Sequence, residues 1–406
     1  MNDRIPRAAA DDYTEEAVQA RRAWLNIRNG DDYPHLYSQS HTEYSSMRGV
    51  IENVVGSVCV PVGIAGPVLV NGEKAKGEFV IPLATTEGTL IASFSRGMRA
   101  MSKSGGCNVS SFPNVWNGPG PYRFRGGALT KISAVFLKNE RLATRFAAWI
   151  ADNGSKMKEE ADRTSRFLSL QEIVPVFHGN VVGLACRYET GNAMGLNMAT
   201  KGNEAICRYI VKNSKEVVPR FLNTLGGDKR FVPDEAKGRY VTASATLTPD
   251  VLARDLRTSA AAMQEFLDVS NLILGQFGIS APNIHIANAI TAFYIACGQD
   301  PAFVTATFRK ARTSFQVATD GALVATVSLP NIIVGTVGGG TKLPTQRDCL
   351  RMIDCEDNPQ KLAELAAVAA LAGEISVAAA VSAGEFTSAH TTLGRGIGPV
   401  ADQKRE

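Results

Sequence analysis

A glutamate behind two threonines is the first group in this 406-residue chain that could carry chemistry. The apolar run FVIPLA (79–84) has the composition of a buried strand, and TLIASFSRGMRAM (89–101) has the apolar spacing of a helix. Glu87, in T-T-E-G between them, is therefore predicted in or just before the first helical turn. There the unpaired N–H groups and the helix dipole stabilise an anion, so an isolated T-T-E-G is by default a structural helix start.

Three further segments carry charged or hydroxyl groups suited to catalysis or phosphate binding. Asp300 in G-Q-D stands where a helix is predicted to stop, between Gly298 and Pro301. The segment GGDKR (226–230) gathers an acid and two bases, and TSRF (164–167) offers a hydroxyl and a guanidinium suited to a phosphate. The structural alternatives are a helix-end turn, a solvated loop and an exposed Ser-Arg pair.

The histidines and cysteines give no metal-binding pattern. Each of the five histidines, taken alone, fits a structural role. His285 in NIHIAN could face a site or fill a core, and His390 in TSAHTTLGRG is predicted to close the last helix, whose dipole favours an imidazolium. The seven cysteines are scattered and form no C-x-x-C pair, which indicates unpaired thiols in a reducing compartment. We therefore expect no metal and a cytoplasmic protein.

The elements that position these groups are predicted from apolar periodicity and turn residues. Residues 1–48 read as a polar helical segment, 50–84 as strands with a hairpin, and 88–103 as a helix. From 119 to 220 the order of strand, helix, strand, strand and helix indicates a compact ferredoxin-like α+β unit. A strand at 239–247 and a long helix from about 249 follow, and an alanine-rich helix is predicted to end near residue 390.

The richest glycine run, VGTVGGGTKLP (334–344), lacks the G-x-G-x-x-G spacing of a Rossmann dinucleotide site. It is either a tight loop at a helix start that holds an anion, or a turn.

Composition excludes several classes of protein. The chain is 45% hydrophobic and 20% charged, and its net charge of +4 is spread along it, so we expect no nucleic-acid partner. The N-terminus has no apolar core and no signal-peptide pattern. The tract LAELAAVAALAGEISVAAAVSAGEF is interrupted by Glu364, Glu374 and Glu385, so we expect no membrane span.

Taken together, these segments resemble the hydroxymethylglutaryl-coenzyme A (HMG-CoA) reductase family over roughly residues 44–395. T-T-E-G, the G-D-K loop, G-Q-D and a histidine near the C-terminus occur in this order in that family. The matching segments are ENVVGSVCVPVGIAGPV, ATTEGTLIASFSRGMRAM, TSRF, GNAMGLNMATKG, NIHIANAITAFYIACGQDPA and LPNIIVGTVGGGTKLPTQRDCL. Because the chain ends soon after His390, it resembles the catalytic domain of the class without a C-terminal flap extension, and we expect no membrane anchor.

The resemblance implies an α+β fold with three parts. These are a helical N-terminal segment (1–48), a large α/β catalytic and substrate domain with a long central helix (49–118 and 221–406), and an inserted small ferredoxin-like domain (119–220). The inserted domain is the family's non-Rossmann NADP-binding domain. Family members assemble as dimers or larger homo-oligomers, with their sites at subunit interfaces.

The resemblance also implies the reaction, a four-electron reduction of an acyl-CoA thioester to an alcohol with two hydrides from NADPH. HMG-CoA to mevalonate is the expected case. By motif matching, Lys229 is the cation at the carbonyl oxygen and Glu87 the general acid. Asp300 is the partner carboxylate that keeps a proton on Glu87, and His390 protonates the departing thiolate.

Further positions are assigned by the same residue-by-residue match. Ser165 and Arg166 match the pair that receives the 2′-phosphate, which favours NADPH over NADH. The cofactor-side positions are Ser165, Arg166, Phe167, Asn192, Met194, Gly195, Asn197 and Arg395. The substrate-side positions are Glu52, Ser93, Arg96, Asn117, Asp228, Arg230, Asn271, His285 and Asn288.

Several positions depart from the family pattern. Asn192 replaces an aspartate, Asn117 an arginine, Asn271 a lysine, Leu222 a serine and Arg230 a second lysine. Fewer charges are left for the free carboxylate of the acyl tail, so HMG-CoA is expected to bind weakly, and a less acidic acyl thioester stays open as the substrate. A third alternative is a non-catalytic acyl-CoA-binding or nucleotide-binding relative, against which the retained catalytic residues argue.

Overall fold

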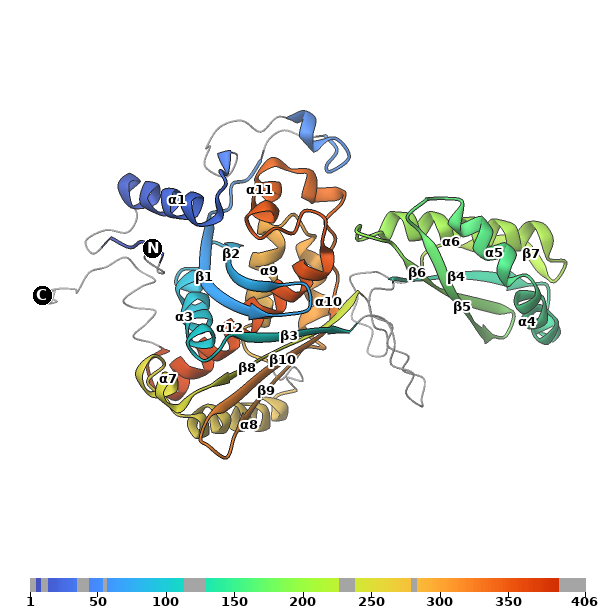
Figure 1. Cartoon of the computed structure of the whole chain (residues 1–406). Helices are drawn as coiled ribbons and strands as arrows, with labels where there is room; N and C mark the ends of the chain where they lie inside the picture. Colours follow the sequence, from blue (N-terminus) through green and yellow to red (C-terminus); the bar gives the residue numbers. More distant parts are fainter. Residues whose placement is uncertain are drawn as a thin grey trace, which may run out of the picture. The chain divides into compact units, whose positions relative to one another are not determined.

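The computed structural model describes residues 5–8, 14–34, 44–53, 57–112, 129–225, 238–278 and 283–386. The chain divides into two compact units (Figure 1). Unit 1 comprises Met1–Ser111, Val241–Leu329 and Thr336–Glu406, and unit 2 comprises Phe112–Tyr240 and Pro330–Gly335. The mixed α+β class predicted from the sequence is confirmed. The expected insert at 119–220 lies within unit 2.

A six-stranded mixed sheet lies mainly in unit 1, in the order β2-β1-β3-β8-β10-β9. The hairpin of β1 and β2 is antiparallel, β1 and β3 are parallel, and β9 and β10 are antiparallel. The strands are β1 (Val62–Asn71), β2 (Lys76–Ala84), β3 (Cys107–Phe112), β8 (Arg239–Leu247), β9 (Arg312–Val317) and β10 (Leu323–Ile332).

The helices of unit 1 include a long buried helix, α12. They are α1 (Glu15–Asn29), α3 (Leu90–Lys103), α7 (Pro249–Arg254), α8 (Ala260–Gln276), α9 (Ile286–Ala296), α10 (Val304–Phe308), α11 (Pro344–Met352) and α12 (Pro359–Ser382). Short 3-10 turns are η1 (Tyr44–Met47), η3 (Pro301–Phe303) and η4 (Gly339–Lys342). Helix α12 packs against α3, α8 and α9 (Figure 1).

The sequence of α12 explains both its helical state and its central place. Alanine has the highest helix propensity, and the helix is apolar on all sides, which is typical of a helix inside a core. Asn358 caps it by accepting a hydrogen bond from the N–H of Lys361 (2.9 Å). A Cβ built on Gly97 of α3 would lie 2.0 Å from the carbonyl oxygen of Ala372, so the two helices cross at a position that only glycine allows.

From the sequence, the alanine-rich tract was expected to be too often interrupted by glutamates to span a membrane, and this argument was wrong. By length and composition alone, α12 would suffice to cross a membrane, but 89% of its most apolar window is buried inside the protein. The helix therefore fills the core of unit 1. It ends at Ser382 rather than near residue 390, and Gly384 follows with a φ of 69°.

Unit 2 has the ferredoxin-like topology expected from the sequence. Its antiparallel sheet has the order β5-β6-β4-β7 within a βαββαβ chain, and helices pack on it (Figure 1). The elements are β4 (Leu129–Leu137), η2 (Glu140–Leu142), α4 (Ala143–Asp152), α5 (Gly154–Asp162), β5 (Ser169–His178), β6 (Val181–Glu189), α6 (Leu196–Asn213) and β7 (Val217–Leu222). Tyr188, Asn203 and Ser133 form a buried hydrogen-bonded chain in its core.

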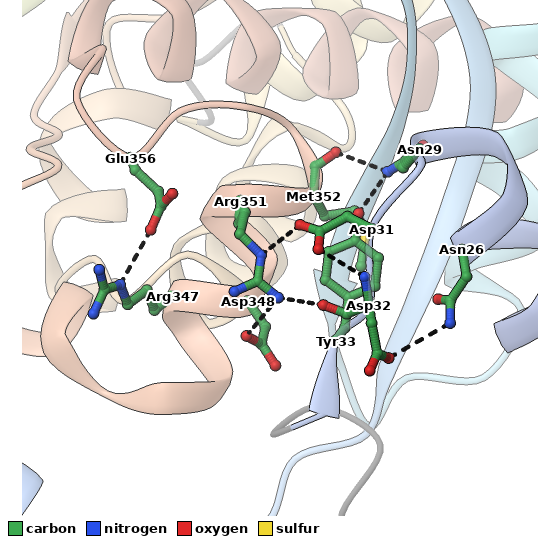
Figure 2. A network of polar contacts seen from close by, with 10 residues as sticks. All are labelled: Asn26, Asn29, Asp31, Asp32, Tyr33, Arg347, Asp348, Arg351, Met352 and Glu356. Atoms are coloured by element: carbon green, nitrogen blue, oxygen red, sulfur yellow. Dashed lines mark hydrogen bonds and ion pairs between the residues drawn. The ribbon is translucent and has the colours of Figure 1, made fainter.

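The described part of the N-terminal segment is fastened to α11 by polar contacts (Figure 2). The Arg351 guanidinium pairs with the Asp31 carboxylate (2.6 Å) and lies over the ring of Tyr33, 5.5 Å from its centroid. Asn29 donates to the Tyr33 hydroxyl (2.8 Å) and to the carbonyl of Met352 (3.1 Å). Helix α1 is thus part of unit 1.

A second predicted helix was also wrong in its extent. The long helix expected from about residue 249 is two helices, α7 and α8. They are separated at residues 255–259, where Arg257 takes a φ of 55°. A left-handed residue cannot continue a right-handed helix, so the chain changes direction there.

Candidate active site

The T-T-E-G segment forms the turn between β2 and α3. The N–H of Glu87 donates to the Thr85 hydroxyl (3.0 Å), and the Thr85 N–H donates to the carbonyl of Pro61 (3.0 Å). Thr89, which precedes the helix, has a φ of 69°, a conformation that is costly for a β-branched residue. Glu87 therefore lies just before the helix, as predicted, and its side chain is exposed.

The G-Q-D segment forms a capped turn after α9. Asp300 is half-buried, and its carboxylate accepts a hydrogen bond from the N–H of Ala302 (3.0 Å). Gln299 is buried and donates through its amide to the carbonyl of Cys297 (2.7 Å). The helix-end turn expected on structural grounds is thus present, and it leaves one carboxylate held at its N-cap.

The glycine run at 334–344 packs against this turn. A Cβ built on Gly298 would lie 2.5 Å from the Gly340 carbonyl oxygen, and a Cβ on Gly340 would lie 2.7 Å from the Gly298 carbonyl oxygen. The two backbones approach so closely that both positions require glycine. The run forms the 3-10 turn η4 just before α11, and an anion-holding role for it stays a prediction. Its contact with the G-Q-D turn helps to position Asp300.

Four of the predicted substrate-side residues lie where α3, the start of α9 and α12 meet: Ser93, Arg96, His285 and Asn288. The Phe94 and His285 rings stack, with centroids 5.2 Å apart. The Asn288 amide nitrogen is 3.1 Å from His285 Nδ1, and the Ser93 hydroxyl donates to that of Ser376 on α12 (3.0 Å). Because an amide nitrogen can only donate, Nδ1 accepts and a neutral His285 ring carries its proton on Nε2.

Arg96 lies on α3, as Ser93 does, and supplies positive charge. Its Nη2 donates to the carbonyl of Leu256 (3.4 Å), and its Nε is buried with no hydrogen-bond partner among the described residues. Burial lowers the pKa of the Arg96 guanidinium, and the nearby Glu385 carboxylate offsets part of that shift. A partly buried guanidinium with an unused Nε donor is suited to an anionic group of a ligand.

The cofactor-side residues gather at one end of unit 2. Ser165 and the exposed Arg166 and Phe167 form the turn between α5 and β5, and the guanidinium lies 4.6 Å from the centroid of the Phe167 ring. The Ser165 hydroxyl lies 3.2 Å from the sulfur of Met198, in the first turn of α6. This contact joins the Ser-Arg turn to the segment that includes Asn192, Met194, Gly195 and Asn197, which leads into the helix.

Gly335 lies against this segment, which sequence reasoning did not foresee. A Cβ on Gly335 would lie 2.4 Å from the N of Met194, so the end of the β10 segment and the cofactor-side loop approach through backbone. The sequence shows a glycine at this position, in VGTVGGG, but no sequence pattern indicates that it lies against Met194.

The remaining predicted residues divide into two groups. Glu52 and Asn271 are exposed, and no contact among the described residues joins either to the His285 cluster. The others lie outside the described residues: Asn117, Asp228, Lys229, Arg230, His390 and Arg395.

The buried cysteines offer no reactive thiolate. Six of the seven cysteines are buried and unpaired. Burial raises the pKa of Cys107, Cys349 and Cys355 to about 12, so these thiols are protonated at neutral pH. In the part of the chain that the structure describes, no three metal-ligating side chains form a cluster. Carboxylates, cations and an imidazole are what the site offers.

Comparison with known proteins identifies the class to which this arrangement belongs. The hydroxymethylglutaryl-coenzyme A reductase profile matches residues 17–395. The 3-hydroxy-3-methylglutaryl-coenzyme A reductases of Methanocaldococcus jannaschii and Aeropyrum pernix are each 35% identical, covering 93% and 94% of this chain and 93% and 90% of their own. The Dictyostelium discoideum reductase 1 is also 35% identical, over 93% of this chain and 68% of its own.

A solved structure shares the fold. That of the class II 3-hydroxy-3-methylglutaryl-CoA reductase from Streptococcus pneumoniae, bound to NADPH, aligns with a TM-score of 0.68 and 18% identity, covering 92% of this chain and 100% of that one. The fold thus defines a two-unit α+β protein with a ferredoxin-like unit. The chain belongs to the hydroxymethylglutaryl-coenzyme A reductase family.

Proposed function

We propose that this protein reduces HMG-CoA to mevalonate with NADPH. The observation that carries the proposal is the family match over nearly the whole chain, including the T-T-E-G, G-D-K and G-Q-D segments and the C-terminal histidine. The first hydride and a proton convert the thioester to a hemithioacetal, which collapses to an aldehyde and coenzyme A thiol. A second hydride and proton give the primary alcohol, so two NADPH and two protons are consumed for each thiol released.

The chain's own residues supply the cation and the protons. Lys229 stabilises the negative charge that develops on the carbonyl oxygen, and Glu87 donates the proton to that oxygen. Asp300 is the carboxylate that keeps Glu87 protonated, and His390 protonates the departing thiolate. In support, Glu87 is exposed in the turn that contains the strained residue Thr89, and Asp300 is held at an N-cap. Both residues belong to unit 1.

Unit 2 fits an NADP cofactor, which supplies the hydrides when bound. The exposed Arg166 guanidinium and the adjacent Ser165 hydroxyl are a charge and a donor suited to the 2′-phosphate. Phe167, with 57% of its surface exposed, offers an aromatic face beside them. The rest of the cofactor is bound from the adjoining loop and the first turn of α6, by Asn192, Met194, Gly195 and Asn197, together with Arg395.

The His285 cluster in unit 1 binds the acyl-CoA. His285 offers an Nε2–H donor, and Arg96 offers a partly buried positive charge to an anionic group of the substrate. Ser93 and Asn288 complete this side, and Glu52, Asn117, Asp228, Arg230 and Asn271 are the further substrate-side residues in the proposal.

The protein is proposed to be a soluble, cytoplasmic homodimer or larger homo-oligomer. The second half of α8 and its C-cap residue support the oligomer, because they expose apolar side chains that a second copy would bury. Their exposed fractions are 51% for Val269, 65% for Leu272, 49% for Ile273, 42% for Leu274 and 78% for Phe277. Sedimentation of the Leu272→Glu variant tests this: we expect a smaller particle than the wild type, and an unchanged mass contradicts the use of this face.

The substrate is tested by the decrease in NADPH absorbance. We expect turnover with HMG-CoA, and little with acetyl-CoA or butyryl-CoA, whose acyl groups lack a free carboxylate. Preference for an uncharged acyl-CoA would replace the substrate in the proposal and keep the reaction. No NADPH oxidation with any acyl-CoA, by a folded protein, would refute an enzymatic role.

A further inference from the structure

Two glutamates are completely buried in α12, ten residues apart. Glu364 and Glu374 are both 0% exposed, in a helix that otherwise consists mainly of alanine, valine and leucine. A carboxylate is buried at high cost unless hydrogen bonds compensate it. Each of these two accepts backbone N–H bonds from a loop distant in sequence, so each holds a loop against α12.

Glu374 holds the loop that carries His285. Its carboxylate accepts the N–H of Ile284 (2.9 Å) and the N–H of His285, and the Thr313 hydroxyl of β9 donates to it at 2.6 Å. Burial raises the pKa of Glu374, and these hydrogen bonds oppose that shift. These groups come from three parts of the chain: β9, α12 and the turn before α9.

The His285 ring is then confined by its other neighbours. Phe94, which is 0% exposed, stacks on it, and Asn288 is hydrogen-bonded to Nδ1. Gly373, next to Glu374, leaves the space: a Cβ there would lie 2.8 Å from His285 Cδ2. The backbone of His285 is thus held by Glu374, and its ring packs against Gly373, the preceding residue of α12.

We propose that Glu374 is a positioning residue for the acyl-CoA site, which fixes the backbone at Ile284 and His285 and so directs the His285 imidazole toward the substrate. This rests on the proposed function, in which His285 contacts the acyl-CoA. Glu374 does not touch the substrate and acts through His285.

Glu364 is a matched control on the same helix. It accepts the N–H groups of Lys74 (3.0 Å) and Ala75 (2.8 Å) at the β1–β2 turn and the Ser111 hydroxyl (2.8 Å). Like Glu374, it is completely buried and accepts hydrogen bonds from successive backbone N–H groups and from one hydroxyl. Loss of Glu364 therefore reproduces the structural cost of losing a buried carboxylate without affecting the loop of His285.

The kinetic test compares Glu374→Ala, Glu364→Ala and Glu374→Gln. Both alanine variants lower the melting temperature, since each leaves buried N–H groups unpaired. Only Glu374→Ala raises the KM for HMG-CoA, on the order of tenfold, with a smaller change in kcat. Glu374→Gln restores most of the affinity, because its amide oxygen still accepts the His285 N–H and its amide nitrogen can donate to the Thr313 hydroxyl oxygen.

A double-mutant comparison separates positioning from general destabilisation. In the His285→Ala background, Glu374→Ala adds no further rise in KM, because the side chain through which it acts is already gone. A KM that rises by the same factor in both backgrounds, or equally in Glu364→Ala, overturns the proposal.

A readout without turnover keeps this inference separate from the proposed reaction. Protein labelled with ¹³C at histidine Cε1 gives one resonance per histidine, and His285→Ala assigns the one shifted by the Phe94 ring. We expect that resonance to move toward the position of a solvated histidine in Glu374→Ala, and to stay in place in Glu364→Ala. An unmoved resonance refutes positioning by Glu374 even if HMG-CoA is reduced. A moved one supports it even if HMG-CoA is not the substrate.

If Glu374→Ala does not fold, the same spectrum is recorded for Thr313→Val, which removes one hydrogen-bond donor to the Glu374 carboxylate. A smaller shift of the His285 resonance in the same direction is then expected.

Discussion

Replacing Gly373 with alanine should disturb both the core and the substrate side of the site. Gly373 lies in the middle of α12, where alanine would ordinarily stabilise the helix by about 1 kcal/mol. Here the added Cβ would lie 2.4 Å from Phe94 Cε1 and 2.8 Å from His285 Cδ2. Carbon atoms in contact are ordinarily about 3.5–4.0 Å apart, so the rings must move by about 1 Å.

The magnitude follows from the lack of room around these rings. Overpacking a filled core costs about 1–3 kcal/mol, and Phe94 is 0% exposed, so the upper part of that range applies. After subtraction of the helix-propensity gain, the expected net loss is about 1–2 kcal/mol. For a unit of this size, that lowers the melting temperature by roughly 2–8 °C. Displacement of His285 should also raise the KM for HMG-CoA about tenfold, the equivalent of one lost hydrogen bond.

Thermal unfolding and steady-state kinetics measure these two effects. Gly154→Ala in α5 is the control, because a Cβ there meets nothing within 4 Å and the same substitution should leave both quantities unchanged or slightly raise the melting temperature. A Gly373→Ala variant that melts at or above the wild-type temperature, with an unchanged KM, would refute the close packing of Phe94 and His285 against α12.

Three further predictions concern the reaction. Glu87→Gln should lower kcat by ~10²-fold or more without a change in melting temperature, because the side chain is exposed; near-normal turnover would remove it as the proton donor. His390→Ala should slow thioester reduction far more than reduction of the free aldehyde, since only the thioester expels a thiolate; equal damage would contradict this role. Arg166→Ala should raise the KM for NADPH ~10-fold or more and leave that for NADH unchanged, whereas Arg163→Ala, an exposed arginine nearby that pairs with acids, should change neither.

Much of the fold could be predicted from local sequence signals. The β1–β2 hairpin was indicated by Asn71 and Gly72 between β-branched runs, and α3 by its apolar spacing. The strand β7, which contains Pro219, was missed because Val217 and Val218 were assigned to the end of the preceding helix, which stops at Asn213. Proline is accommodated there because β7 is at the edge of its sheet, where a missing N–H leaves no ladder bond unmade.

The site was predictable as segments and much less as an arrangement. The T-T-E-G and G-Q-D turns were recognised as motifs and are formed locally. The partners of Glu374 are 90 and 61 residues away in the sequence, so no local pattern could identify it. In the sequence, Glu364 and Glu374 only interrupt an apolar tract. Their roles follow from long-range packing, which periodicity does not encode.

The most direct test of the central claim is the ratio of NADPH oxidised to coenzyme A thiol released, measured on the same HMG-CoA reaction as it goes to completion. A complete reduction to the alcohol predicts two NADPH for each thiol. A ratio of one would mean that the reaction stops at the aldehyde, and thiol release without NADPH oxidation would mean hydrolysis; either result would contradict the four-electron reduction proposed for this protein.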